Sequence, residues 1–206
     1  MPDRLIWTRA ADDVFETAVT SASMARALAE RLRDAGQAED VVAGLRSVAV
    51  RFRPDHAAGV EAWLASLPEI SEPSPETGPP VDISVHYGGE FGPDLGAVCT
   101  ALGLAEEAFI ARHTGAVHTV EMMGFTPGFA YVSGFPEGMD IARFDDPRPR
   151  VAAGSVGISA GFTGLYALAG PGGWPLVGRT LDRLFDPAGE EPFRLRAGQR
   201  IRFRAV

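Results

Sequence analysis

The chain has 206 residues, 46% of them hydrophobic and 22% charged, and this composition is typical of a folded globular protein with one large or two small domains. The formal charge of −8 and the scattered arginines disfavour a nucleic-acid partner, because an acidic surface repels a phosphate backbone. No apolar run approaches the roughly 20 residues of a membrane helix, and residues 1–13 lack the layout of a signal peptide. Cys99 is the only cysteine, which excludes an internal disulfide and fits a reducing compartment. We therefore expect a cytoplasmic protein that contacts no membrane.

Residues 1–66 predict a small α+β domain. Short strands are expected at residues 5–8, 14–19 and 47–52, the last because Val48, Val50 and Phe52 alternate with less apolar residues. A helix is expected over residues 23–35, capped by Ser21 or Ser23 and ended by Gly36, and a second helix follows from the spacing of Val60, Leu64 and Leu67.

Residues 67–80 predict a linker, because the prolines of SLPEISEPSPETGPP support neither a helix nor a central strand. Beyond it, residues 81–206 hold most of the glycines and turn dipeptides, and many short strands with tight turns favour a closed β-barrel. Strands are expected at residues 83–85, 117–123, 156–159, 165–168, 176–179, 193–195 and 200–204. Asp94 is the expected N-cap of a helix that ends at Gly103, and a second short helix is expected over 105–113.

Two motifs are interpreted as structural on their own residues. GWPLVGRT, at residues 173–180, nearly matches a phosphate-binding loop, but Pro175 has no N–H and the residues after it predict a strand. Ser155 lies outside a nucleophile elbow and lacks an obvious Asp and His partner order. The four histidines show no metal-ligand spacing, and His113 and His118 need not share a face, so we expect no metal site.

Aromatic residues gather around the glycine and proline turns of the second domain. Phe125, Phe129, Tyr131, Tyr166 and Trp174 stand near polar residues, and aromatic walls with a few polar groups are typical of a small-molecule pocket. Turn-rich β-domains also need such residues for packing, so both interpretations remain open at this point.

Five segments together resemble one family. They are HYGGEFGPDLGAV, GFTPGFAYVSGFP, PRPRVAAGSVGI, GFTGLYAL and GPGGWPLVGRTLDRLFDP, in that order through the second domain. The resemblance is to the family of KipI, the first subunit of allophanate hydrolase and the B subunit of 5-oxoprolinase, and within it the 5-oxoprolinase member is the most similar. It implies a small α+β domain followed by a cyclophilin-like β-barrel.

The resemblance also implies an activity that needs partners. Within a hetero-oligomer with the C and A subunits, this family's enzyme opens the lactam of 5-oxoproline to L-glutamate with ATP hydrolysis, so this chain is expected to be inactive alone. ATP, with Mg²⁺, would be bound by the complex. Phosphorylation of the lactam oxygen makes the carbon more electrophilic, so water can attack this stable amide. Two alternatives stay open: a KipI-like inhibitor of a histidine kinase and a component of allophanate hydrolase.

The resemblance further implies site residues by position. Arg150 is the candidate anion clamp and His113 the candidate proton carrier, which makes these two the expected catalytic residues. The expected substrate-binding residues are Ser155, Thr163, Tyr166, Phe125 and Phe129.

The chain departs from the family pattern in three places. Phe162 stands where the family usually has Gln, and Ala167 stands where it usually has Pro. Residues 11–13 lack the usual Gly-Asp signature. The loss of an amide before Thr163 removes one polar group that could have contacted the lactam.

Overall fold

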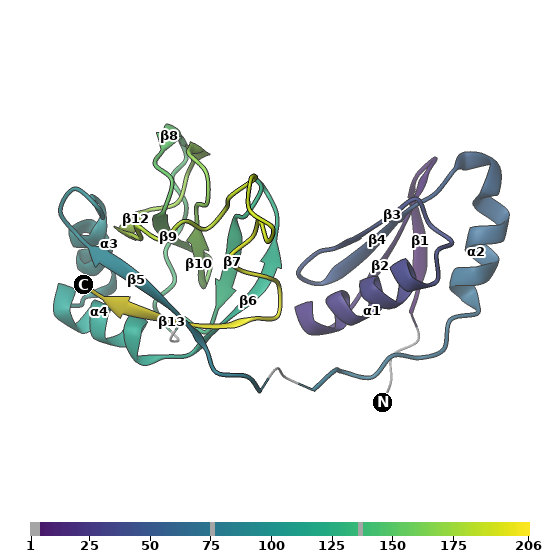
Figure 1. Cartoon of the computed structure of the whole chain (residues 1–206), viewed down its shortest axis with the longest axis horizontal. Helices are drawn as coiled ribbons and strands as arrows, with labels where there is room; N and C mark the ends of the chain where they lie inside the picture. Colours follow the sequence, from purple (N-terminus) through teal and green to yellow (C-terminus); the bar gives the residue numbers. More distant parts are fainter. Residues whose placement is uncertain (1–4, 75–76, 136–137) are drawn as a thin grey trace. The chain divides into compact units, whose positions relative to one another are not determined.

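The computed structural model describes residues 5–74, 77–135 and 138–206 and divides into two compact units, Met1–Pro75 and Glu76–Val206 (Figure 1). Residues 75 and 76 of the predicted linker lie outside the described residues. The first unit is a sheet with helices and the second contains a closed barrel, which confirms the predicted α+β class. Within the described ranges, no helix is long and apolar enough to cross a bilayer.

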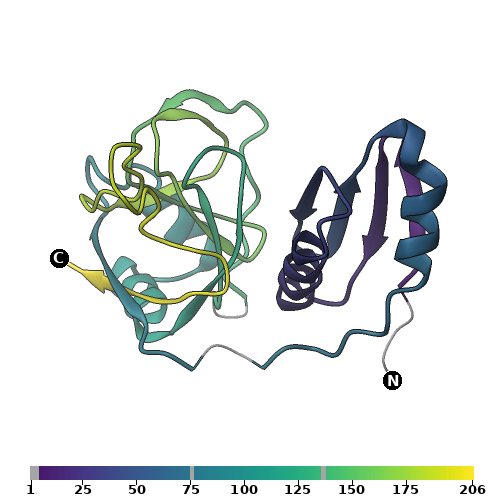
Figure 2. The same cartoon turned by 45° about the vertical axis from the view of Figure 1, so that its right-hand side comes forward.

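The first unit is a four-stranded antiparallel sheet with helices against one face (Figure 2). Its elements are β1 (Trp7–Ala11), β2 (Val14–Ala18), α1 (Ala22–Asp34), β3 (Asp40–Ala43), β4 (Ser47–Arg51), η1 (Pro54–His56) and α2 (Ala57–Ala65). The strand order is β1-β2-β4-β3. Inward-facing Phe15, Val48 and Val50 share one buried cluster with Leu28 of α1 and Leu64 of α2, so both helices cover the same face.

Local chemistry at the ends of α1 follows the prediction. The Ser21 hydroxyl accepts a hydrogen bond from the Met24 N–H at 3.1 Å and satisfies one of the free donors of the first turn. Gly36 has φ +64°, which a residue with a side chain rarely adopts. β3 was not predicted, because Asp40–Ala43 is too short for an alternation to stand out.

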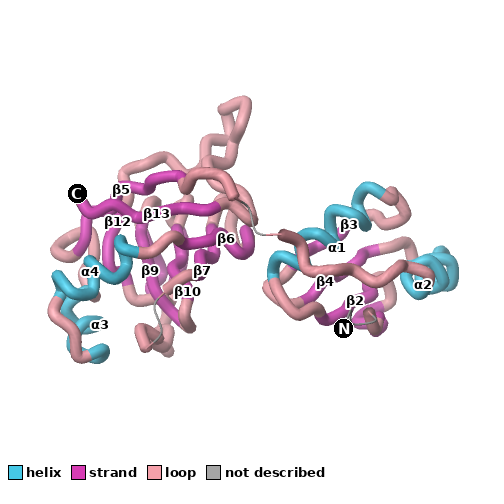
Figure 3. Tube along the Cα trace, turned by 90° about the horizontal axis from the view of Figure 1, so that it is seen from below, coloured by secondary structure: helices cyan, strands magenta, loops and turns pink. Residues whose placement is uncertain are grey.

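The second unit is a closed seven-stranded barrel with two helices beside it (Figure 3). Its elements are β5 (Val81–Tyr87), α3 (Leu95–Leu102), α4 (Glu106–Gly115), β6 (His118–Met123), β7 (Ala130–Ser133), β8 (Arg148–Val151), β9 (Ser155–Ser159), β10 (Phe162–Leu165), β11 (Gly170–Gly172), β12 (Leu176–Arg179) and β13 (Arg200–Ala205). The barrel order is β10-β7-β6-β13-β5-β12-β9, and β9 pairs with β10 to close it. This confirms the predicted barrel.

Strands β8 and β11 pair with each other outside the barrel and form a two-stranded arm that projects from it (Figure 1). Neither was predicted, because proline and glycine dominate both segments. β7 was also not predicted. The strand expected at residues 165–168 was placed wrongly: β10 ends at Leu165, and the chain turns away at Tyr166, where the main chain bonds Ser155 and Gly154. Of residues 193–195, only Phe193 makes a β-bridge, to Phe185.

Helix α3 ends at Gly103, which has φ +65°, and begins with Asp94 at its N-cap position, as predicted. The Asp94 carboxylate accepts no cap hydrogen bond; instead it accepts one from Arg148 Nη2 at 2.7 Å and one from the Leu176 N–H at 2.6 Å. Arg148 belongs to the arm and Leu176 to barrel strand β12. Asp94 therefore joins the arm to the barrel through a mostly buried carboxylate, whose side chain is 14% exposed.

Replacement of Asp94 by Asn is expected to lower the free energy of unfolding of the barrel unit by about 1.5–3 kcal/mol, because Arg148 and Leu176 donate to different oxygens and an amide nitrogen in place of one of them cannot accept. A urea titration measures the loss, and Asp145→Asn, an exposed position in the loop before the arm, is the matched control. Equal midpoints for the two variants would contradict this role of Asp94.

Candidate functional site

A pocket of about 250 Å³, which we call the aromatic pocket, opens at the rim of the barrel beside the arm. Its lining residues are Phe125, Phe129, Tyr131, Arg143, Pro147, Tyr166, Pro171, Gly172, Gly173 and Trp174. The volume is smaller than the roughly 300–1,000 Å³ of pockets for drug-sized molecules, so it suits a small ligand.

The rings of the pocket pack edge to face around Phe129. Its ring centroid lies 4.9 Å from that of Tyr166 and 4.8 Å from that of Tyr131, with interplanar angles of 89° and 64°. Trp174 stands perpendicular to it at 6.1 Å. Such contacts fix the orientation of each ring, so the walls are formed before any ligand arrives.

Two glycines make room for these rings. A Cβ on Gly164 of β10 would lie 2.8 Å from both Phe129 and Trp174, and a Cβ on Gly172 of β11 would lie 2.5 Å from the Tyr166 hydroxyl. Both approaches are closer than real Cβ contacts. The glycines at these positions are therefore required by the aromatic packing.

The turn before β7 places Phe125 in an uncommon backbone conformation. Its φ is +71°, and its ring is 61% exposed at the mouth of the pocket. The turn is held by main-chain hydrogen bonds from Thr126 N to Gly124 O and from Phe129 N to Thr126 O. A non-glycine residue held at positive φ stores strain, which is characteristic of functional sites.

His113 lies inside the barrel rather than at the aromatic pocket. Its side chain is fully buried, Nδ1 is 2.6 Å from the Tyr87 hydroxyl and Nε2 is 2.9 Å from Thr163 Oγ1. Phe203 stacks on its ring at 4.3 Å. Burial, with a smaller contribution from His118, holds the pKa of His113 well below its usual range. A neutral imidazole satisfies both contacts, since one nitrogen donates and the other accepts.

His113 and His118 lie together, although their spacing in the sequence did not require it. Their ring centroids are 5.3 Å apart, and His118 Nε2 lies 2.8 Å from the His113 carbonyl oxygen. Burial lowers the pKa of His118, against the hydrogen bonds to backbone carbonyls that raise it. In the ranges that the structure describes, no three His, Cys, Asp or Glu side chains are grouped as metal ligands.

The structure brings only some of the predicted site residues together. Phe125, Phe129 and Tyr166 line the aromatic pocket, whereas Thr163 contacts His113 inside the barrel and Ser155 is buried on β9. Arg150 lies exposed on β8 of the arm. The catalytic roles of His113 and Arg150 and the substrate contacts of Ser155 and Thr163 stay predictions.

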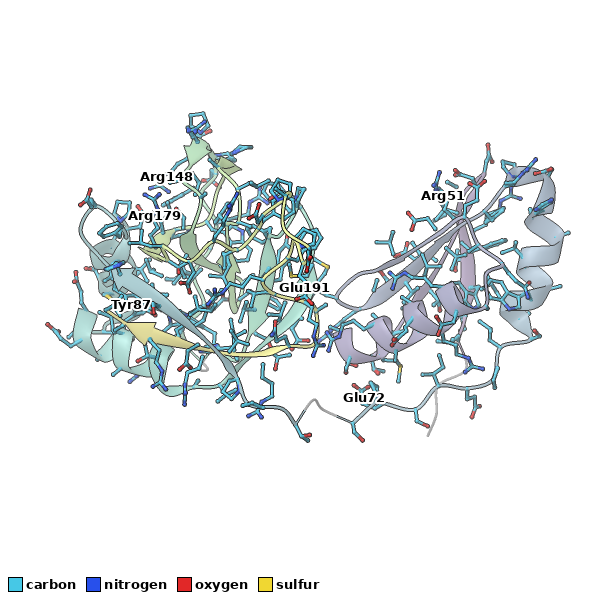
Figure 4. All side chains as sticks on the ribbon, in the orientation of Figure 1. Arg51, Glu72, Tyr87, Arg148, Arg179 and Glu191 are labelled. Carbon is cyan, nitrogen blue, oxygen red and sulfur yellow. The ribbon has the colours of Figure 1, made fainter. Side chains whose placement is uncertain are left out.

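The segment that resembles a phosphate-binding loop is a barrel strand, β12, with a loop before it. The N–H of Leu176 donates to Asp94, and Gly178 packs so closely that a Cβ would lie 2.7 Å from Val85. Figure 4 shows Arg179, the residue at the lysine position of the motif, on the same side of the barrel as Arg148. Its Nε donates to the Ala153 carbonyl at 2.9 Å. These residues do not form a cradle for ATP.

Sequence reasoning did not identify Arg143 and Pro147 as pocket residues. Both lie in the loop between β7 and the arm, where no periodicity or motif marks them. The loop is held over the pocket by the Phe144 N–H, which donates to Gly173 O at 2.7 Å, and by Arg148, whose guanidinium lies 4.8 Å from the Phe144 ring centroid.

Residues 5–195 match the family model described as carboxyltransferase domain, subdomain C and D. The chain belongs to this family. Two similar curated proteins are both named as the B subunit of 5-oxoprolinase. The one from Escherichia coli O157:H7 is 39% identical over 91% of this chain and 88% of its own length. The one from Bacillus subtilis is 43% identical over 70% of this chain, and the match spans only 59% of that relative.

Two solved structures share the fold of this chain. TTHA0988 superposes with a TM-score of 0.78 at 34% identity, covering 94% of this chain and 40% of that one. Urea amidolyase of Kluyveromyces lactis superposes with a TM-score of 0.75 at 14% identity, covering 98% of this chain and 15% of that one, and shows the fold alone.

Gly164→Ala is expected to destabilise the barrel unit by about 1–3 kcal/mol and to disturb the pocket rings, because the new methyl group overlaps Phe129 and Trp174. Near-UV circular dichroism measures the packing of the pocket rings, and a urea titration measures the free energy of unfolding. Gly170→Ala is the matched control, since a Cβ there meets nothing within 4 Å. Identical spectra for both variants would count against tight ring packing.

His113 is expected to make stability depend on pH. Its pKa is lower in the folded chain than in the unfolded chain, so the unfolded state binds more protons once the pH falls below the usual histidine pKa. Stability is full above about pH 6.5 and falls below it, with a slope of up to about 1.4 kcal/mol per pH unit from this residue.

Urea titrations between pH 7.5 and 5 test this expectation. His113→Gln should show a shallower loss of stability on acidification than the unmodified chain, although it is less stable at pH 7.5. His56→Gln, which removes an exposed histidine of the other unit, is the control. Parallel curves for the unmodified chain and His113→Gln would refute the prediction.

Proposed function

We propose that this chain is the B subunit of an ATP-dependent 5-oxoprolinase that acts in the cytoplasm with the C and A subunits and converts 5-oxoproline to L-glutamate. The observation that supports it most directly is the 39% identity to the Escherichia coli B subunit, over 88% of the length of that protein. A likeness that runs through both units makes a shared role more plausible than a shared fold alone.

The geometry of the barrel is compatible with a small substrate. The aromatic pocket is preformed, and a lactam ring can pack against Phe129 and Trp174 with little loss of ligand freedom. In this proposal the barrel binds and orients, and the strained Phe125 turn stands at the entrance.

The proposed need for partner subunits rests on the lack of a phosphate-binding loop at strand β12. ATP supplies a phosphoryl group that turns the lactam oxygen into a better leaving group. The strand β12 cannot form a phosphate cradle, because its first N–H is taken by Asp94. We therefore assign ATP, with Mg²⁺, to the complex, and we expect this chain to be inactive alone.

We keep Arg150 as the proposed anion clamp, and we assign it to an interface with a partner subunit. It lies on the exposed face of the arm, outside the aromatic pocket, where a partner chain could present phosphoryl oxygens to it. In this arrangement, Arg150 acts on turnover and not on retention of 5-oxoproline.

The test is co-expression of this chain with its genomic neighbours and an assay of ADP release that depends on 5-oxoproline. The complex should release ADP, and the chain alone should not. Arg150→Ala should reduce turnover of the complex at least 100-fold, on the order expected for loss of a transition-state contact, while the complex still assembles. Arg183→Ala, an exposed arginine paired with Asp186, is the control.

No ADP release from a well-folded complex would contradict the proposal, as would full activity of the chain alone. Inhibition of a histidine kinase by the chain, without ADP release, would favour the KipI-like inhibitor instead. Full turnover by Arg150→Ala would remove that residue from the mechanism and leave the assignment of the chain to the complex in place.

A further inference from the structure

Of the described residues that line the aromatic pocket, Arg143 alone carries a charge. The others are aromatic, proline or glycine. Arg143 is exposed at the edge of this aromatic wall, and its guanidinium can form charge-assisted hydrogen bonds with one anionic group. This combination selects a small ligand with one negative charge and a flat or cyclic body.

Tyr131 offers the pocket a hydrogen-bond donor. Burial raises the pKa of its phenol, so the hydroxyl keeps its proton at neutral pH. Its ring contacts those of Phe129 and Trp174, with centroid distances of 4.8 Å and 5.9 Å. Tyr166 also lines the pocket, and burial raises the pKa of its phenol, against a hydrogen bond with the Trp174 backbone that lowers it. The Tyr131 hydroxyl is a phenol that can donate to a carbonyl oxygen in the pocket.

We propose that the aromatic pocket binds 5-oxoproline in this chain itself, before any partner is present. Arg143 pairs with the carboxylate of the ligand, Tyr131 donates to the lactam carbonyl oxygen, and the five-membered ring lies against Trp174. The identity of the ligand rests on the proposed function; the charge and the size of the ligand rest on the pocket. Arg143 is thereby the residue that distinguishes an acidic lactam from a neutral one.

Fluorescence of Trp174 gives a direct measurement. Trp7 and Trp63 belong to the other unit, so the full chain with Trp7→Phe and Trp63→Phe leaves Trp174 as the reporter. The Trp7 replacement removes no hydrogen bond, because its Nε1 is buried without a partner among the described residues. 5-Oxoproline is titrated into this chain, and 2-pyrrolidinone, the same ring without the carboxylate, is titrated in parallel.

Saturable binding of 5-oxoproline is expected, with 2-pyrrolidinone at least 10-fold weaker. Arg143→Ala should weaken 5-oxoproline about 10-fold or more, the size of one charge-assisted hydrogen bond, and leave 2-pyrrolidinone unchanged. Arg143→Lys should recover part of the loss, and Tyr131→Phe should weaken both ligands. Arg112→Ala, exposed on α4 away from the pocket, is the matched control and should bind as the reporter chain does.

No saturable signal with 5-oxoproline, equal affinity for both lactams, or an unchanged affinity in Arg143→Ala would each overturn the inference. The two proposals fail separately. If the complex releases ADP while the titration shows no binding, the pocket inference falls and the function stands. If the titration behaves as expected while the complex releases no ADP, the function falls and the pocket remains a site for a small acidic lactam.

Discussion

The position of the arm at the rim of the barrel depends on the hydrogen bonds that the Asp94 carboxylate accepts. This carboxylate joins Arg148 of the arm to the main chain of Leu176, two segments that no local sequence rule would bring together. Through Arg148 it also positions the Phe144 ring, and the Phe144 N–H is bonded to Gly173 on the far side of the aromatic pocket. One wall of the pocket therefore depends on a charge, and the other wall is formed by packed rings on a turn held by main-chain hydrogen bonds.

The polar groups of the barrel fall into two separate systems. Inside, Tyr87, His113 and Thr163 form a hydrogen-bonded chain whose central imidazole is closed off from solvent. At the rim, the aromatic pocket carries a phenol and a guanidinium that a ligand can reach. A fully satisfied interior chain specifies how β5, α4 and β10 meet, which is a structural role for His113, and its role as a proton carrier stays a prediction. The rim is the part of the barrel where a ligand can be recognised.

Helix ends and alternating strands could be predicted from the sequence, whereas the arm formed by β8 and β11 could not. The Ser21 cap, the Gly36 end and the alternation around Val50 follow from local rules, and the structure follows them. All five pocket aromatics were named from the sequence, because they stand near glycine and proline turns. Arg143 was not, because its place depends on a loop held by contacts distant in sequence. Arg150 was expected at the pocket from the family resemblance, whereas the structure has it on the exposed arm, outside the pocket lining.

Strand β13 lies between β5, the first strand of the barrel, and β6, and its pairing with β5 is parallel. No hairpin can make that pairing, so the barrel stays open until residues 200–205 have left the ribosome. Until then the facing edges of β5 and β6 have unpaired main-chain groups, which invite association with other chains. A late, non-local closing step also predicts slow folding. Removal of residues 200–205 would therefore sharply lower the amount of folded protein that cells produce, although only a few residues are lost.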